Sequence, residues 1–291
     1  MRRWGDAAFV SARDVSERPE LWLPGALAWI AGVGWIPFIA AVLRPPTVAE
    51  LTFLGAGIVS AGSWPWNAVA MGLASLGIAL LAFGLVAAGN ATLLALLSGR
   101  RPSGSDLVSL LAVGAVVAVP FAFAVPVLVV SLVEVVPGEF NAAESPGGPV
   151  LRSIARVAPL IAVAGALVIL AASLAAVAGA IAVHRRVGPV ASLRTALSAF
   201  VRIGAPALAH IAASAVAHVV YLAFAILLLG VLWAPIGARL GGGAGLDVAI
   251  GLLLVGFVAI WLCLVLAGGA LHAWSAATWS HLLAADASEG T

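Results

Sequence analysis

The chain has 291 residues, of which 63% are hydrophobic and only 9% are charged, and its formal net charge is +2. A soluble domain of ordinary composition carries about 25% charged residues, so this composition excludes one, and the small net charge does not favour a nucleic-acid-binding surface. Several stretches between Trp22 and Leu283 lack Asp, Glu, Lys and Arg altogether. They exceed the ~20 apolar residues with which an α-helix crosses a bilayer, so the sequence predicts a multi-pass membrane protein.

The apolar runs, separated by Pro, Gly and charged residues, predict an all-α bundle of about six transmembrane helices. The predicted spans are 22–43, 66–98, 107–136, 155–183, 205–235 and 248–283. They make up a transmembrane domain over 21–286, between a cytoplasmic interfacial segment 1–20 and a cytoplasmic tail 287–291. The first segment is polar and contains acidic residues, unlike the basic start of a secretory signal, so no cleavable signal peptide is expected.

Two short amphipathic or apolar helices are predicted near the first span. Residues 1–18 allow an interfacial helix that Pro19 ends, with one face that contains Trp4, Ala8, Ala12 and Val15. Further on, the sequence Thr47-Val48-Ala49-Glu50 has the pattern of a capping box. It opens an apolar run to Ser60 of about 12 residues, which is too short to span and is typical of an interfacial or re-entrant helix.

The later connections are polar. Residues Pro137 to Pro149 are rich in Pro, Gly, Glu and Asn, which predicts an exposed outer loop. The stretch His184 to Ile203 predicts an amphipathic helix capped by Ser192. Its apolar face holds Leu193, Ala196, Leu197 and Phe200, and its other face holds Arg194, Ser198 and Arg202. This helix either lies on the cytoplasmic interface or is only an elbow that orients the next span. In the first case four arginines contact lipid phosphates: Arg185, Arg186, Arg194 and Arg202.

The arginines predict the orientation, because cytoplasmic loops retain positive charge. All 14 basic residues are Arg. If both termini lie on the cytoplasmic side of a prokaryotic cytoplasmic membrane, the outer side receives only Arg44, Arg152, Arg156 and Arg239. The other arginines then lie inside, which is the bias expected of this topology.

Three predicted cytoplasmic segments place a Pro before a helix: Arg18-Pro19-Glu20-Leu21-Trp22-Leu23, Arg101-Pro102-Ser103-Gly104-Ser105-Asp106-Leu107 and Gly188-Pro189-Val190-Ala191-Ser192-Leu193. Each opens a pair of spans, which favours three helical hairpins in series. With the terminal motif His272-Ala273-Trp274-Ser275-Ala276-Ala277-Thr278-Trp279, these segments resemble a family of uncharacterised six-span prokaryotic membrane proteins. That family is related to the membrane domain of some glycerophosphodiester phosphodiesterases. The resemblance implies a six-helix architecture without an assigned chemistry, because the diesterase activity belongs to a separate metal-binding barrel domain.

One predicted span carries a coherent polar stripe, which contains His210, Ser214, His218 and Tyr221. At 100° per residue these side chains lie within about 80° of one another. With Asn90 of the second span they either line a polar cavity or form hydrogen bonds between helices. The two histidines are about 12 Å apart along the helix axis, too far to share one ion without ligands from other helices. No metal site and no cofactor are therefore expected.

The sequence does not predict an enzyme. No span contains paired carboxylates for acid–base chemistry, and no carboxylate accompanies His210 and Ser214 as a triad requires. The leading hypothesis is a non-enzymatic membrane protein that organises lipid or partner proteins. Small residues in the fourth span support it by permitting close helix contact: Ala172, Ala175, Ala176, Gly179 and Ala180.

The alternative hypothesis is a permease, or the membrane subunit of a transporter, for a neutral or lipid-like substrate. Pro120 and Pro126 interrupt the third span, and interrupted helices often adjoin the binding sites of transporters. A tolerated proline kink is the structural explanation of the same pattern. The expected partners are membrane lipids and, beyond them, other membrane proteins or a transporter ATPase.

Overall fold

The computed structural model describes residues 2–43, 62–141, 149–242 and 247–289, together with Phe53, Gly57 and Ser60. Over these residues the chain is helical apart from short turns, and it contains no strand. The principal helices are α1 (Arg2–Glu17), α2 (Trp22–Trp29), α3 (Ile36–Val42), α5 (Trp66–Leu97), α6 (Gly104–Asn141), α7 (Pro149–Arg185), α8 (Pro189–Ile203), α9 (Ala205–Gly241) and α10 (Val248–Glu289).

Four of the described helices, α5, α7, α9 and α10, are long and apolar enough to cross a membrane. The segments Pro19–Gly34 and Ile36–Val42 together form a fifth candidate that bends by 48°. The prediction of an all-α chain with several helices long and apolar enough to span a membrane is thus confirmed for the described residues. Helix α6 is 38 residues long and carries two shorter apolar stretches, Gly104–Pro120 and Pro126–Val136.

The first predicted span is not one straight helix. Its middle is the π-helical turn η2 (Ile30–Gly34), which separates α2 from α3. Pro37, in the first turn of α3, has no N–H with which to bond the preceding turn, and π-bulges and prolines are the common causes of sharp kinks. Gly34 lies against the Trp29 ring, where an added Cβ would be 2.2 Å from ring carbon Cε3. The bend therefore depends on a proline and a glycine in consecutive turns.

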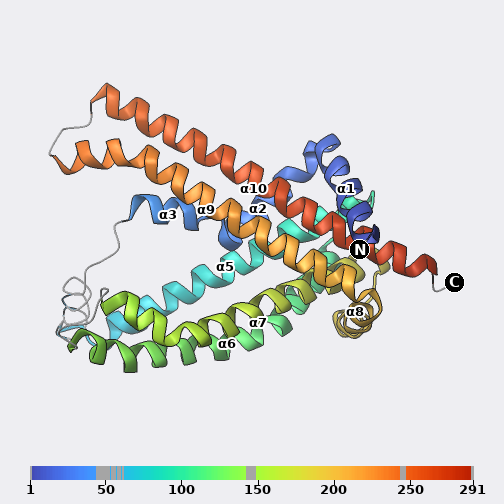
Figure 1. Cartoon of the computed structure of the whole chain (residues 1–291), viewed down its shortest axis with the longest axis horizontal. Coiled ribbons are helices and arrows are strands. Elements are labelled where there is room, and N and C mark those ends of the chain that lie inside the picture. Colours follow the sequence, from blue (N-terminus) through green and yellow to red (C-terminus); the bar gives the residue numbers. More distant parts are fainter. Residues whose placement is uncertain are drawn as a thin grey trace.

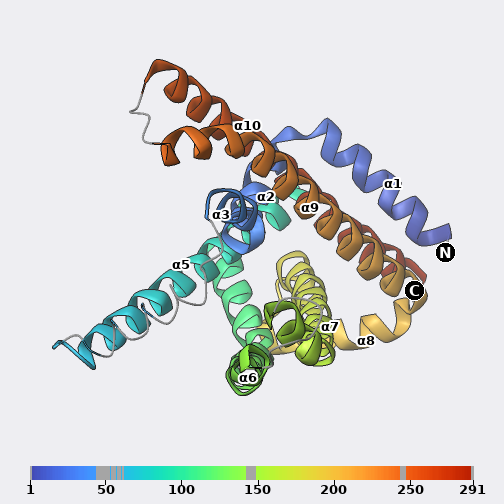
Figure 2. The same cartoon turned by 60° about the vertical axis from the view of Figure 1, so that its left-hand side comes forward.

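The helices form two arms that meet at one end of the molecule (Figure 1). Helices α9 and α10, with α3 beside α9, make one arm, and α6 packed along α7 makes the other with α5. The arms converge where α1, α8 and both termini lie. Figure 2 shows the N-terminal part of α5 extending away from the other helices. None of the 18 consecutive residues that form the most apolar part of this helix is buried.

Glycines allow α2, α5 and α10 to cross in backbone contact where the arms converge. A Cβ added at Gly25 would lie 2.3 Å from the carbonyl oxygen of Gly269, and one added at Gly89 would lie 2.7 Å from the backbone nitrogen of Ala28. Real Cβ atoms do not approach so closely. The junction therefore requires residues without side chains, as is common where membrane helices meet.

Helix α1 forms as predicted and ends before Pro19, but its buried face differs from the prediction. Ser11 is fully buried, whereas Ala12 is exposed. The Ser11 hydroxyl donates to the carbonyl of Ala7 at 2.7 Å, so its burial leaves no unsatisfied polar group. The indole of Trp274 donates to the carbonyl of Ala8 at 3.0 Å and fastens α1 to α10.

Helix α8 begins earlier than predicted. Its N-cap is Gly188 and Pro189 is its first residue, so Ser192 is not the cap but lies inside the helix, fully buried. The Ser192 hydroxyl donates to the carbonyl of Pro189 at 2.8 Å. Of the predicted apolar face, Ala196 is buried, whereas Leu197 is 58% exposed.

The outer connection after α6 is shorter than predicted. Residues Pro137 to Asn141 continue α6 as helix, and α7 begins at Pro149. Glu139, only 4% exposed, lies between two guanidinium groups at 2.9 Å from Arg152 and 2.5 Å from Arg156. This ion-pair cluster joins the end of α6 to the start of α7. The predicted capping box at 47–50 lies outside the described residues.

Candidate functional site

A cavity of about 390 Å³ lies between α5, α6, α7 and α10 near the convergent end of the arms. Each helix contributes residues spaced three or four apart, so one face of every helix points at the cavity. Most of the lining is apolar. The α5 and α6 faces comprise Phe83, Val86, Ala87, Asn90, Leu94, Leu110, Val113, Gly114, Val117 and Ala118. The α7 and α10 faces comprise Ala172, Ala175, Ala176, Gly179, His272, Ser275, Ala276 and Trp279.

The small residues of α7 create this space. Ala172, Ala175 and Ala176 line the cavity, and Ala175 and Ala176 also pack against the neighbouring core. Gly179, one turn further on, lines the cavity too and is in the close contact that the sequence predicted, because an added Cβ would lie 2.6 Å from a methyl carbon of Leu110. The stripe therefore both lines the cavity and brings α7 against α6.

The cavity has one polar wall, where α5 meets α10, and Leu94 and Trp279 of the same helices line the cavity beyond it. Asn90 Oδ1 and His272 Nε2 are 2.9 Å apart, which joins the two helices, and Asn90 Nδ2 donates to the carbonyl of Val86 at 3.0 Å. Ser275 and Trp279 follow His272 on the same face of α10 and also line the cavity. Of the five polar residues predicted to line a cavity or to join helices, Asn90 is thus the one that lines this cavity.

The predicted stripe of α9 packs beside the polar wall, against α10. His210 Nε2 lies 3.2 Å from Ser275 Oγ, and Ser214 Oγ lies 3.0 Å from the same oxygen. His218 Nδ1 donates to the backbone carbonyl of Ser214 at 2.7 Å. Tyr221 donates its hydroxyl proton to the carbonyl of Leu264 at 2.5 Å. Three of the four stripe residues therefore make bonds to α10 that hold the arm together.

His210 is the most enclosed of these residues. It is fully buried, and its ring meets the rings of Trp274 and Trp279 at centroid distances of 5.6 and 4.7 Å. Both contacts have the edge-to-face geometry that aromatic quadrupoles favour. Trp279, which is itself only 3% exposed, thus separates His210 from the cavity that the indole lines.

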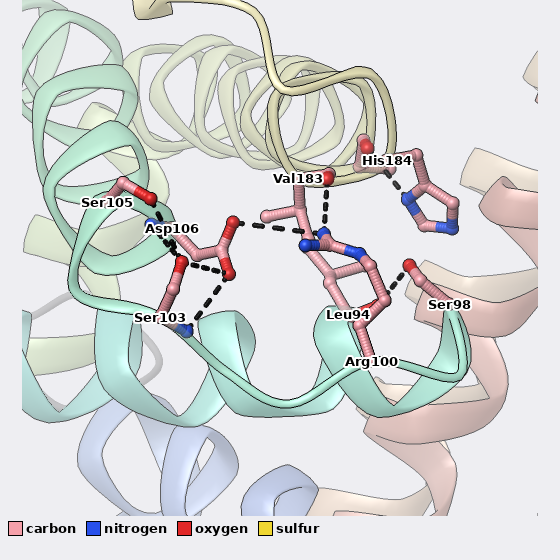
Figure 3. Close-up of polar contacts among 9 residues, drawn as sticks. Leu94, Ser98, Arg100, Ser103, Ser105, Asp106, Val183 and His184 are labelled. Atoms are coloured by element: carbon pink, nitrogen blue, oxygen red, sulfur yellow. Dashed lines mark hydrogen bonds and ion pairs between the residues drawn. The ribbon is translucent and has the colours of Figure 1, made fainter.

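A charged layer lies where the end of α5, the start of α6 and the end of α7 meet (Figure 3). The Arg100 guanidinium donates to the carbonyl of Val183, near the last turn of α7, and lies 3.8 Å from Asp106. Asp106 accepts hydrogen bonds from the hydroxyl and backbone N–H of Ser103 at 2.7 and 3.1 Å, which caps α6. The charges nearest to the cavity therefore already have partners within this layer.

The four arginines predicted to contact phosphates are all exposed near α8. Arg202 lies 2.9 Å from Asp286 of α10, and this hydrogen bond raises the pKa of its guanidinium. The outward face of α8 carries Val190, Leu197 and Val201, which are 70, 58 and 83% exposed, on either side of Arg194. Exposed apolar side chains flanked by arginine are typical of a helix that lies on a membrane surface.

His272, Ser275 and Trp279 were not predicted as a group and occur in the sequence only within the terminal motif. The three are spaced i, i+3 and i+7, which puts them on one helix face. This spacing was the available signal. It identifies a polar face on α10 that matches the one on α9.

Comparisons with protein-family models, with curated proteins and with solved structures find no match to this chain. The resemblance to the six-span family therefore stays a prediction. In the described part of the chain, no three His, Cys, Asp or Glu side chains are grouped so that they could hold a metal ion.

Proposed function

We propose that this chain is a multi-pass membrane protein that holds a lipid-like molecule in the cavity between α5, α6, α7 and α10. Its role is to organise membrane lipid without transforming it. The observation that carries this proposal is the lining of the cavity, which is mostly apolar and has hydrogen-bonding groups on the wall where α5 meets α10. From Leu94 to Phe83 the α5 lining extends over about 16 Å, at 1.5 Å per residue.

An acyl or isoprenoid chain suits such a cavity, because it has no polar group to satisfy along the apolar part. Ala118 of α6 and Ala172 of α7 line the cavity and are exposed. We infer that the cavity opens between these two helices toward the bilayer. A lipid chain reaches it from the side without passing through water.

The architecture that we propose retains six spans in three hairpins, with α6 and the bent first segment as the additional two. Both termini then lie on the cytoplasmic side of the membrane. Two features support this. The N- and C-termini lie at the same end of the molecule, which an even number of crossings requires (Figure 1). Helix α8 and its arginines lie at that end as well.

Further contacts are proposed for the free part of α5. Trp66, Leu73 and Ile78 are 72, 64 and 69% exposed there. This surface faces lipid or another membrane protein, including the membrane-bound partner of a transporter ATPase. Copurification from native membranes distinguishes these cases.

The experiment for the proposed function measures which lipids remain bound to the purified protein. Ala176→Trp fills the cavity, because Ala176 lines it. Ala115→Trp adds the same side chain to an exposed position of α6 that does not line it. Native mass spectrometry should find a retained lipid in the wild type and in Ala115→Trp but not in Ala176→Trp. Equal retention in all three proteins would contradict the proposal.

A permease remains the second candidate function, and a bent helix elsewhere in the chain now supports it. Helix α6 continues through Pro120 and Pro126, and its two shorter apolar stretches end and begin at these prolines. A bend of 48° lies in the first segment, before α3. Broken helices often adjoin transporter sites. Saturable flux of a lipid-like substrate into proteoliposomes would favour this candidate over a static lipid-binding role.

A further inference from the structure

The hydrogen bonds at the polar wall of the cavity fix how the Asn90 and His272 side chains are oriented. Asn90 Nδ2 donates to the carbonyl of Val86. A carbonyl oxygen only accepts, so this bond fixes the amide and leaves Oδ1 toward His272 Nε2. Oδ1 also only accepts, so the Nε2 atom of His272 carries a proton. In the neutral imidazole, the lone pair is then on Nδ1.

Two of these polar groups remain unused. His272 Nδ1 and the second N–H of Asn90 have no hydrogen-bond partner among the described residues. Four nitrogens among the described residues are fully buried and lack a hydrogen-bond partner, and they belong to Trp4, Trp29, His210 and Trp261. His272 Nδ1 is not among these fully buried nitrogens. The polar wall therefore presents one unused acceptor and one unused donor, on two lining residues that are joined by a hydrogen bond.

Charge excludes one class of ligand. Among the described residues that line the cavity, none is Asp, Glu, Lys or Arg. Arg100, in the layer beyond, is held by Val183 and Asp106. A phosphate placed at the polar wall would be buried without a cation, which is strongly unfavourable. A hydroxyl group, in contrast, both donates and accepts one hydrogen bond and so satisfies both unused groups.

We propose that the cavity selects a neutral lipid with a free hydroxyl group in its head, the chemistry of a diacylglycerol or a long-chain alcohol. The hydroxyl donates to His272 Nδ1 and accepts from Asn90, and the hydrocarbon chain extends along the small residues of α7. This inference rests on the proposed function, because it names the class of lipid that the same cavity holds.

The test uses three probes with identical acyl chains, each with a diazirine in one chain: a diacylglycerol, its acetate ester and the corresponding phosphatidic acid. The purified full-length protein is placed in phosphatidylcholine nanodiscs, irradiated with each probe and mapped by peptide mass spectrometry. The diacylglycerol should label the lining peptides of α5, α7 and α10 about tenfold more than either other probe, the ratio expected when a buried hydrogen bond is lost.

A pair of histidine variants locates the selectivity. His272→Phe should label equally with the diacylglycerol and its acetate, because the acceptor is gone. His281→Phe is the matched control on α10, since His281 pairs with Asp14 at 3.0 Å and does not line the cavity. It should retain the tenfold preference. If His272→Phe does not fold, the three-probe comparison in the wild type decides alone.

The outcomes separate the two proposals. Labelling of the lining by the acetate or the phosphatidic acid as strongly as by the diacylglycerol would overturn the hydroxyl inference and leave the lipid-binding cavity standing. Absence of any label in the lining peptides, with label only on outward surfaces, would overturn both.

Discussion

The crossing of α2 and α10 makes Gly269 a position where one methyl group tests the packing of the bundle. In Gly269→Ala the new Cβ would lie 2.4 Å from the backbone nitrogen of Ala26 and 2.5 Å from the carbonyl oxygen of Trp22. Ordinary contacts of a Cβ are 3.4–4 Å. The two helices must therefore separate by about 1 Å, and both atoms are backbone that cannot rotate away. Overpacking of this kind costs about 1–3 kcal/mol.

A control on the same helix isolates this steric effect. Gly256 has no atom within 4 Å of an added Cβ, so Gly256→Ala changes only helix propensity, which favours Ala over Gly by roughly 0.5–1 kcal/mol. We expect Gly269→Ala to melt at a lower temperature than the wild type in detergent, and Gly256→Ala to melt at an equal or higher one. Fluorescence-detected thermal unfolding measures both. Equal melting of the two variants would refute the backbone contact between α2 and α10.

Two further predictions concern the polar residues and the topology. His210→Ala should lower the free energy of unfolding by about 2 kcal/mol, because it leaves a hole between two indoles. His218→Ala removes only a partly buried bond within α9, to the Ser214 carbonyl, and should cost about 0.5–1 kcal/mol. Unchanged melting with lost lipid binding would instead make the stripe part of the site. In a background without Cys263, a cysteine at Asn141 should react with an impermeant thiol reagent from outside and one at Ser198 should not, and the reverse pattern would contradict the arginine argument.

The sequence was sufficient to locate the long helices, because each is a charge-poor apolar run with a distinct break at its ends. The predicted spans 66–98 and 248–283 begin at the same residues as α5 and α10. Run length does not report bends, and so the π-helical turn before Pro37 was not predicted. For α1, a buried face of apolar residues that includes Ala12 was predicted. Ser11 is buried instead, and its hydroxyl is satisfied by a hydrogen bond within the helix.

The cavity could not be predicted, because it depends on side-chain volumes from four helices at once. The α7 stripe of alanines is equally compatible with a tight contact and with an open space, and only the positions of α5 and α10 distinguish them. Asn90 was predicted as a buried amide. Its partner His272 lies 182 positions away in the sequence, and a pairing at that distance depends on which helices become neighbours.

An experimental structure of the protein in a native lipid bilayer tests the central claim most directly. It should contain elongated density in the cavity, with a chain beside Ala176 and a head group beside the hydrogen-bonded pair of Asn90 and His272. The same determination for Ala176→Trp should show the indole in place of that density. A wild-type cavity that is closed by its own side chains, or lipid density confined to the outer surfaces of α5 and α10, would contradict the account.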